Sequence, residues 1–180
     1  MSLRGVKARL TPHPATPCAA LRRLEVEARW SPERLALAFR GEGEIDGLAI
    51  PAPAAPRRTD GLWRRTCFEA FALGAGGAYV ELNLSPSGEW AAYRFSGYRD
   101  GMAPLEPFAA PAVAFERAAD RLQLDAGLVA RAFAAPSRLA ISAVIEETGG
   151  RLSYWALAHP PGRPDFHHAS GFVLELPEPA

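Results

Sequence analysis

Acidic and amide side chains lie between apolar residues in the stretch from residue 67 to residue 84. Glu69 lies within the run Cys67-Phe68-Glu69-Ala70-Phe71, and farther along Glu81 and Asn83 alternate with apolar residues. Burying a bare carboxylate is costly, so Glu69 is expected to be either paired or functional. Carboxylate and amide groups form hydrogen bonds with hydroxyl groups, and aromatic rings stack on the C–H faces of sugars. These residue types therefore fit a site for a sugar or another small polar ligand.

Strand alternation would bring these side chains to one surface. Residues 66–73, 78–84 and 89–95 are predicted strands, and turns at 74–77 and 85–88 join them into an antiparallel meander. Successive side chains of a strand point to opposite faces of the sheet. One face of the meander is apolar and is assigned to the core. We expect the opposite face to carry the polar set and its aromatic neighbours: Trp63, Glu69, Tyr79, Glu81, Asn83, Trp90 and Arg94.

A purely structural role for this polar face stays open. Outward charges on a strand are often only solvated, and a Glu opposite an Arg is an ordinary cross-strand pair. The position of Glu69 among large apolar side chains is what favours a ligand site.

The rest of the chain predicts an all-β fold. Seventeen prolines and sixteen glycines divide it into short segments. Residues 24–30 alternate apolar and polar side chains, and 35–39 is the expected hairpin partner. Further strands are expected at 112–115, 121–124, 139–146, 152–158 and 171–176. About ten strands predict an immunoglobulin-like or jelly-roll antiparallel β-sandwich.

Two segments are harder to assign. Residues 41–61 are rich in Gly, Pro and Ala and are expected to form a long loop, with a short strand near 45–50 left open. Residues 125–135 fit either a helix or an irregular segment.

The composition fits one globular domain over residues 1–180. Hydrophobic residues make up 48% of the chain and charged residues 22%, which excludes a disordered protein. The loop at 41–61 is not a linker, because only about 40 residues precede it and these are too few for an independent core.

Charge and hydropathy exclude several classes of partner. Lys plus Arg total 20 and Asp plus Glu total 20, whereas a nucleic-acid-binding protein would show a basic excess. No apolar run approaches the ~20 residues that span a bilayer. The first ten residues lack the pattern of a signal peptide, and the two cysteines form neither a disulfide framework nor a metal-ligand spacing. We therefore expect a cytoplasmic protein.

Two motifs resemble a known family. They are Leu62-Trp63-Arg64-Arg65-Thr66-Cys67-Phe68-Glu69-Ala70-Phe71 and Tyr79-Val80-Glu81-Leu82-Asn83-Leu84-Ser85-Pro86-Ser87-Gly88-Glu89-Trp90. Both resemble the DOMON-like domains that are akin to family 9 carbohydrate-binding modules, in which an acidic residue follows a Trp six positions on, as Glu69 follows Trp63. The resemblance covers roughly residues 20 to 176, and Tyr98–Met102 and Trp155–His167 are typical of an uncharacterised bacterial subgroup.

The resemblance implies a non-catalytic binding module. In the sugar-binding members two tryptophans sandwich a terminal sugar, and a Glu with an Arg or Asn bonds its hydroxyl groups. By resemblance Trp63, Glu69 and Arg94 take these roles, with Trp155 or Phe166 as the second aromatic residue. The predicted ligand-binding residues are Trp63, Arg65, Glu69, Tyr79, Glu81, Asn83, Trp90, Arg94, Trp155, His159, Asp165, Phe166 and His167.

Histidines near the C-terminus raise the question of a metal. His159, His167 and His168 lie near Asp165 in a Pro/Gly-rich loop, and His and carboxylate ligands suit zinc. Their spacing matches no standard signature, so no metal is predicted.

Two further functions remain as alternatives. Some DOMON relatives bind b-type haem between a Met and a His or Lys, and Met102 with His159 or His167 would be the pair here. An acid–base enzyme would use Glu69 or Glu81 with His167. The sequence shows no Ser/His/Asp order and no phosphate loop, so neither a catalytic residue nor a cofactor is predicted.

Overall fold

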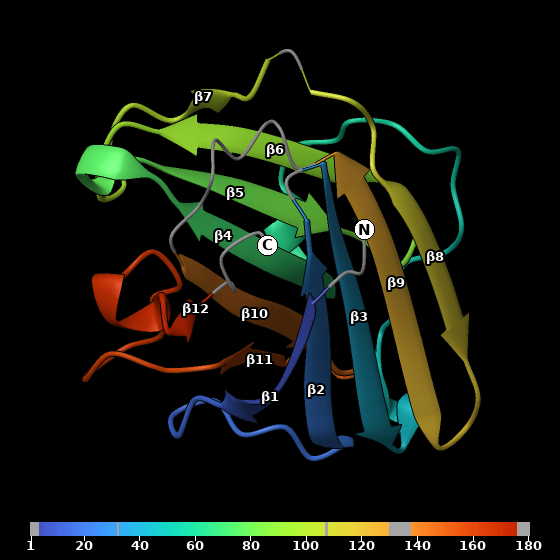
Figure 1. The fold of residues 1–180 in the computed structure, drawn as a ribbon. Coiled ribbons are helices and arrows are strands. Elements are labelled where there is room, and N and C mark those ends of the chain that lie inside the picture. The colour runs from blue at the N-terminus through green and yellow to red at the C-terminus, as the bar shows by residue number, and fades with distance from the viewer. Residues whose placement is uncertain (1–3, 32, 107, 130–137, 176–180) are drawn as a thin grey trace.

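The fold, a computed structural model, is described for residues 4–31, 33–106, 108–129 and 138–175 (Figure 1). Within these residues the regular structure consists of strands and short 3₁₀ turns, and no helix is long and apolar enough to cross a bilayer. The strands are β1 (Arg4–Pro12), β2 (Leu21–Trp30), β3 (Arg34–Gly43), β4 (Cys67–Leu73), β5 (Tyr79–Leu84), β6 (Trp90–Phe95), β7 (Ala103–Pro104), β8 (Ala112–Arg117), β9 (Arg121–Val129), β10 (Arg138–Glu146), β11 (Leu152–Ala156) and β12 (Leu174–Glu175). The turns are η1 (Ile45–Gly47), η2 (Leu62–Arg64), η3 (Ala75–Gly77) and η5 (Ala169–Gly171).

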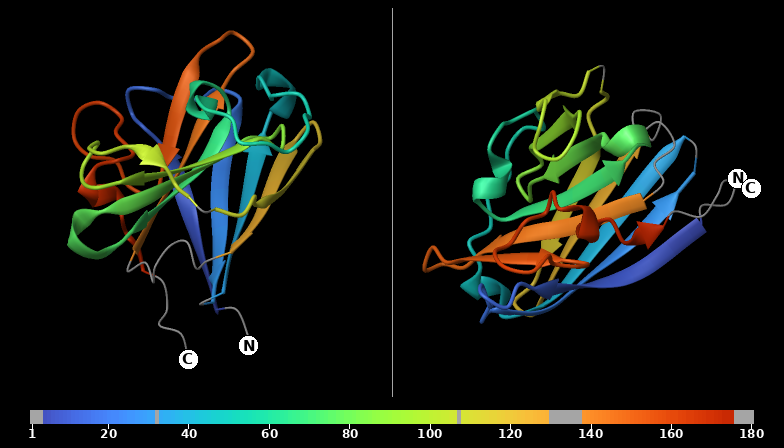
Figure 2. Two further views of the ribbon diagram at one scale, coloured as in Figure 1. Left: turned by 90° about the horizontal axis from the view of Figure 1, so that it is seen from above. Right: turned by 90° about the vertical axis from the view of Figure 1, so that its left-hand side faces the viewer.

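The strands form one curled antiparallel sheet. Its order is β7-β6-β5-β4-β10-β11-β1-β2-β3-β9-β8, and β12 pairs with β10. Strand β1 makes the turn of the curl, because its residues Arg4–Leu10 pair with β2 whereas Thr11 and Pro12 pair with β11. We call β1, β2, β3, β9 and β8 the β2 half, and β11, β10, β12, β4, β5, β6 and β7 the β4 half. Figure 2 shows the two halves facing each other.

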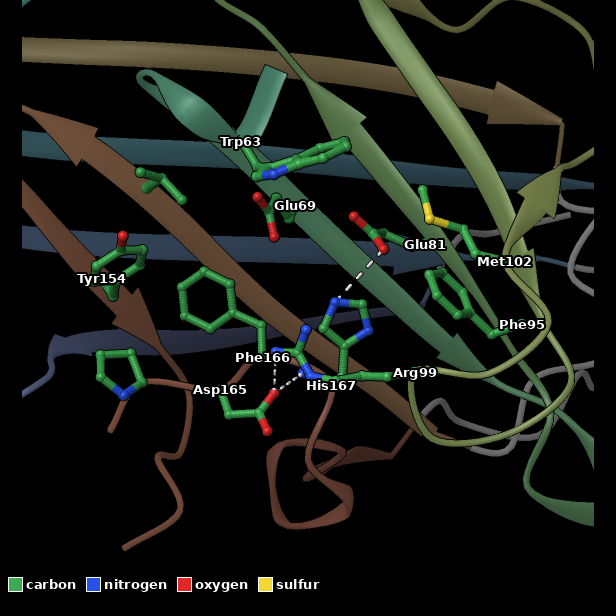
Figure 3. A pocket seen from close by; sticks show the side chains of 12 residues that line it. Trp63, Glu69, Glu81, Phe95, Arg99, Met102, Tyr154, Asp165, Phe166 and His167 are labelled. Atoms are coloured by element: carbon green, nitrogen blue, oxygen red, sulfur yellow. Dashed lines mark hydrogen bonds and ion pairs between the residues drawn. The ribbon is translucent and has the colours of Figure 1, made fainter. Parts of the chain in front are cut away.

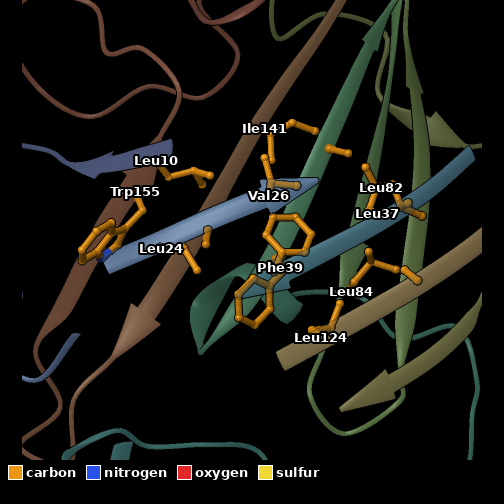
Figure 4. Packing of buried hydrophobic residues seen from close by; sticks show 14 of the residues in the cluster. Leu10, Leu24, Val26, Leu37, Phe39, Leu82, Leu84, Leu124, Ile141 and Trp155 are labelled. Carbon is orange, nitrogen blue, oxygen red and sulfur yellow. The ribbon is translucent and has the colours of Figure 1, made fainter. Parts of the chain in front are cut away.

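The core lies between the two halves. In β2, Leu24, Val26 and Ala28 are buried and alternate with the half-exposed Glu25 and Glu27, as the sequence predicts. The β4 half contributes its own apolar face to the same cluster. Figure 4 shows side chains from both halves in contact: Leu10, Leu24, Val26, Leu37, Phe39, Leu82, Leu84, Leu124, Ile141 and Trp155.

The β4 half is buried on both faces. A second apolar cluster covers its outer face and includes Phe71, Tyr79, Tyr93, Phe95 and Phe172. Every residue of β4 except Leu73 is buried, which explains why apolar residues interrupt the expected polar alternation there.

The prediction of an antiparallel all-β protein is confirmed, and the meander at β4, β5 and β6 lies where it was expected. Strand β1 was not predicted, since its pairing with both halves depends on partners far along the chain. The possible short strand near 45–50 is not formed. The turn η1 lies there, followed by an isolated bridge at Leu48. Residues 125–129 extend β9, and 130–135 fall outside the described residues.

Replacing Phe39 tests the contact between the halves. Its ring is fully buried and lies 4.9 Å from that of Phe68 in β4. We expect Phe39→Ala to lower the free energy of unfolding by about 3–5 kcal/mol, because it leaves a cavity in the shared core. Urea unfolding measures this, and Val173→Ala, at a side chain 51% exposed, should change stability by no more than about 0.5 kcal/mol. Equal effects of the two variants would contradict this account of the core.

Candidate functional site

A pocket of about 340 Å³ opens on the outer face of the β4 half. Strands β4, β5, β6, β10 and β11 supply its floor, and the segments around residues 99–102 and 164–167 supply its rim (Figure 3). The lining residues are Trp63, Glu69, Glu81, Phe95, Arg99, Met102, Val144, Tyr154, Pro164, Asp165, Phe166 and His167.

Glu69 lies on the pocket floor with an unsatisfied oxygen. Its side chain comes from the centre of β4 and is 2% exposed. Oε2 accepts a hydrogen bond of 3.4 Å from the Ser142 hydroxyl of β10, whereas the buried Oε1 has no partner among the residues that the structure describes. Burial, and next the charge of Glu81, raise the pKa of Glu69 well above its ordinary value. Glu69 is therefore a buried acceptor that faces a cavity.

Glu81 is the second carboxylate of the floor. It projects from β5 onto the same face as Glu69, because Glu69 pairs with Asn83 across the ladder. Its Oε1 accepts a hydrogen bond of 2.9 Å from the Asn83 amide, and its Oε2 lies 3.8 Å from Nε2 of His167. Burial raises the pKa of Glu81, while Asn83 and Arg99 act in the opposite direction.

His167 is held in the neutral form beside Glu81. Burial, and next the charge of Arg99, lower its pKa to about 4. The Tyr79 hydroxyl lies 2.8 Å from Nδ1 and accepts a hydrogen bond of 3.2 Å from the Arg99 backbone N–H. The Tyr79 hydroxyl keeps its own proton for donation to Nδ1, and in that arrangement the proton of the neutral ring lies on Nε2, facing Glu81.

Asp165 joins the two rim segments. Arg99 Nη2 donates to Asp165 Oδ1 over 2.7 Å, the Tyr98 hydroxyl donates to Oδ2, and the His167 backbone N–H donates to Oδ1 over 3.0 Å. Burial by itself would raise the pKa of Asp165, but the bonds from Tyr98 and Arg99 lower it below its ordinary value. Arg99 has a φ of 54°, which is uncommon for a residue other than glycine. Its hydrogen bonds to Asp165 and to the Tyr79 hydroxyl hold this conformation in place.

Aromatic side chains form the walls. Trp63 comes from η2 and packs edge-on against Tyr93 at 6.1 Å, and Tyr93 in turn donates a hydrogen bond of 2.5 Å to Asp60. Phe166 packs against Tyr154 of β11 at 5.9 Å. In Figure 3, Trp63 and Phe166 lie on opposite sides of Glu69. A flat ligand would therefore find aromatic surfaces flanking a carboxylate.

Two residues predicted for this face lie on the other one. The ladder pairs Asn83 with Ala91 and Glu81 with Tyr93, so Trp90 and Arg94 share the opposite face with Leu84 and Val80. Trp90 is buried in the core between the halves, and Arg94 is exposed. The prediction was wrong because alternation within β6 leaves two possible phases, and the cross-strand register selects the one that turns Tyr93 and Phe95 toward the pocket.

Three other predicted residues also lie away from the pocket. Trp155 is packed in the core and donates its indole N–H to Ser153 over 3.1 Å, so it is not the second aromatic wall. His159 packs on His13 and donates to the Thr11 carbonyl over 2.8 Å. Arg65 is exposed and faces Glu146 at 3.7 Å. The partners of His159 and Arg65 lie far from them in the sequence.

The structure brings together Trp63, Glu69, Glu81, Asp165, Phe166 and His167 in one pocket. Tyr79 and Asn83 are not lining residues but bond to residues that are: Tyr79 bonds to His167, and Asn83 bonds to Glu81. Sequence reasoning missed Arg99, Phe95 and Tyr154. The motif Tyr98–Met102 was the available signal for Arg99, since it holds a cation and an aromatic residue in a loop.

The metal and haem alternatives depend on His159, His167 and His168, and the structure places these three side chains in different surroundings. His159 lies beside His13, His167 lines the pocket, and His168 caps η5 through a bond from the Ser170 N–H. Among the residues that the structure describes, no three His, Cys, Asp or Glu side chains converge in a metal-binding group. Met102 does line the pocket with His167, but both ring nitrogens of His167 face protein groups, so this pair does not fit an axial haem site.

Comparison with known proteins finds a similar fold but no sequence match. No protein-family model matches the sequence, and no curated protein matches it. The structure is similar to the crystal structure, at 2.70 Å resolution, of a candidate carbohydrate-binding protein from Bacteroides uniformis ATCC 8492. The likeness shows a shared fold. It has a TM-score of 0.65 and 12% sequence identity, and it covers 94% of this chain and 84% of that chain.

Neutralising Glu69 should stabilise the protein at high pH. Because its pKa is raised on folding, the folded state holds this proton more tightly, and stability is lost as the pH rises above the ordinary value of 4.5. Glu69→Gln removes that loss, by about 1.4 kcal/mol for each pKa unit, or about 3 °C in Tm for a chain of this size. We expect its Tm advantage over the natural protein to be larger at pH 8 than at pH 4.

Thermal unfolding between pH 4 and pH 8 measures this difference. Glu44→Gln, at an exposed side chain outside the pocket, is the matched control and should differ from the natural protein equally at every pH. A Glu69→Gln variant that loses Tm relative to the natural protein as the pH rises would show that the charged carboxylate is stabilised by a partner.

Proposed function

We propose that this chain is a non-catalytic module that binds a carbohydrate, or a similar hydroxyl-rich small molecule, in the pocket of the β4 half. The observation that carries the proposal is Glu69, whose side chain lines a cavity flanked by Trp63 and Phe166 and whose buried Oε1 has no hydrogen-bond partner among the described residues. An unsatisfied buried acceptor is costly in the empty protein, and a ligand hydroxyl removes that cost.

The remaining lining suits a sugar ring. Arg99 carries several N–H donors at the rim, and Glu69 and Glu81 offer acceptors on the floor, so hydroxyl groups can both accept and donate. Trp63 and Phe166 provide the apolar surfaces on which sugar C–H faces stack. A volume of about 340 Å³ lies at the lower end of the range for small-ligand pockets, which fits one or two sugar rings.

The fold supports the same proposal by analogy. We propose that the curled sheet is a DOMON-like β-sandwich forming one domain over 1–180, akin to family 9 carbohydrate-binding modules, with Phe166 as the second aromatic wall and Arg99 in the role first given to Arg94. The similar Bacteroides uniformis protein is described as a candidate for carbohydrate binding. The free thiols of Cys18 and Cys67 suit a reducing compartment, so the proposal includes a cytoplasmic location.

Sugar-dependent thermal stability tests the proposal. A panel of neutral, acidic and amino mono- and oligosaccharides should contain a ligand that raises Tm, since a ligand at 100 times its Kd adds about 2.7 kcal/mol to the free energy of unfolding. Trp63→Ala should abolish this shift, and Trp63→Phe, which keeps an aromatic face, should retain part of it. Absence of any shift across the panel would leave the pocket without a carbohydrate ligand.

Product analysis separates binding from catalysis. Glu69, Glu81 and His167 line the same pocket, so the enzymatic alternative predicts cleavage of an oligosaccharide that binds. We expect the bound oligosaccharide to be recovered intact after prolonged incubation with the protein. Cleavage that disappears in Glu69→Gln would overturn the non-catalytic assignment.

A further inference from the structure

The positive charge of the pocket is already neutralised. Arg99 is the one Lys or Arg among the lining residues, and its guanidinium lies 2.7 Å from Asp165. Asp165 also accepts hydrogen bonds from Tyr98 and from the His167 backbone. The charges of this rim pair therefore compensate each other, although Arg99 keeps N–H groups that do not bond to Asp165.

The two glutamates of the floor have no such partner. In the described part of the chain neither Glu69 nor Glu81 forms an ion pair with a Lys or Arg. His167 lies 3.8 Å from Glu81, but it is neutral at pH 7 because its pKa is about 4. The two carboxylates also repel each other on one face of the sheet. The floor thus holds two carboxyl groups that no Lys or Arg of the described residues pairs with directly.

We infer that the ligand of this pocket carries a positively charged amino group, as in an amino sugar, and that this group lies against Glu69 and Glu81. The inference rests on the proposed function for the sugar part of the ligand. An ammonium group has three donors and no acceptor, which matches the unpartnered Glu69 Oε1. A neutral hydroxyl would satisfy one lone pair but would not pair with the charged form of the carboxyl group.

The walls favour the same group. Trp63 and Phe166 flank Glu69, and the faces of aromatic rings attract cations, most strongly those of Trp. A cation seated between them would be attracted by the rings and by the floor at once. A carboxylate or phosphate in this place would instead be repelled by both glutamates.

Proton release provides an independent signature. The charged or titratable side chains that line the pocket beside Glu69 are Glu81, Arg99, Tyr154, Asp165 and His167. Burial and the charge of Glu81 raise the pKa of Glu69 well above its ordinary value, so Glu69 holds a proton more tightly in the empty pocket than a free carboxyl group does. An ammonium ligand favours the charged carboxylate and would displace a proton held there: the carboxyl O–H breaks, the carboxylate pairs with the ligand, and the proton passes to the buffer. A neutral sugar would leave the proton in place.

The experiment compares matched sugars on the full chain at pH 7. Glucosamine, galactosamine and mannosamine are each titrated beside the parent hexose and the N-acetyl form, which lacks the charge, and cyclohexylamine serves as an amine without a sugar. Calorimetry in two buffers of different ionisation enthalpy reads affinity and proton release. We expect at least one amino sugar to bind tenfold or more tightly than its two neutral counterparts, with release of a proton.

Variants locate the effect. Glu69→Gln should reduce the affinity for the amino sugar to that for the parent hexose and abolish proton release, whereas Glu44→Gln on the exposed surface should change neither. Equal affinity for the amino, parent and N-acetyl forms would overturn this inference and leave the proposed function intact. Binding of cyclohexylamine without any sugar would support the ammonium site and overturn the carbohydrate assignment. No binding by any probe would overturn both.

Discussion

The pocket depends on the removal of two carboxyl groups from water. Glu69 and Glu81 occupy the outer face of the β4 half, where the rim segments, η2 and a second apolar cluster cover the sheet. Within the part of the chain that the structure describes, the Ser142 hydroxyl and the Asn83 amide are the groups that bond to them directly. Such an arrangement is destabilising in the empty protein, and it is a common property of sites that are completed by a ligand.

Asp165 holds the two rim segments together over this face. Asp165 bonds to Arg99 and Tyr98 of one rim segment and to the His167 backbone of the other, although these segments are more than sixty residues apart. Tyr79 extends the same network inward, since it bonds to the Arg99 backbone and to the His167 ring. The charged rim therefore holds the two loops together over the floor of the pocket.

The apolar core and the polar pocket lie on opposite faces of the β4 half. The inner face joins the β2 half through a continuous apolar core, in which Phe39 meets Phe68. The outer face carries the polar groups within a smaller aromatic cluster. The glutamates do not interrupt the apolar core. The free energy gained by burying that core can therefore offset the cost of burying Glu69 and Glu81. Strand alternation makes this division possible, since neighbouring residues such as Phe68 and Glu69 serve opposite faces.

The sequence by itself determined the antiparallel strands, the meander and the shared face of Glu69, Glu81 and Asn83, because side-chain alternation and turn residues are local properties. It could not determine which phase of β6 faces the site, so Trp90 and Arg94 were assigned to the wrong face, while Tyr93 and Phe95 were passed over. It also could not show that Trp155 packs in the core, nor that Arg99 and Tyr154 reach the pocket. These placements depend on cross-strand register, on β1 joining the two halves and on loops that meet through Asp165, and each of these links residues far apart in the chain.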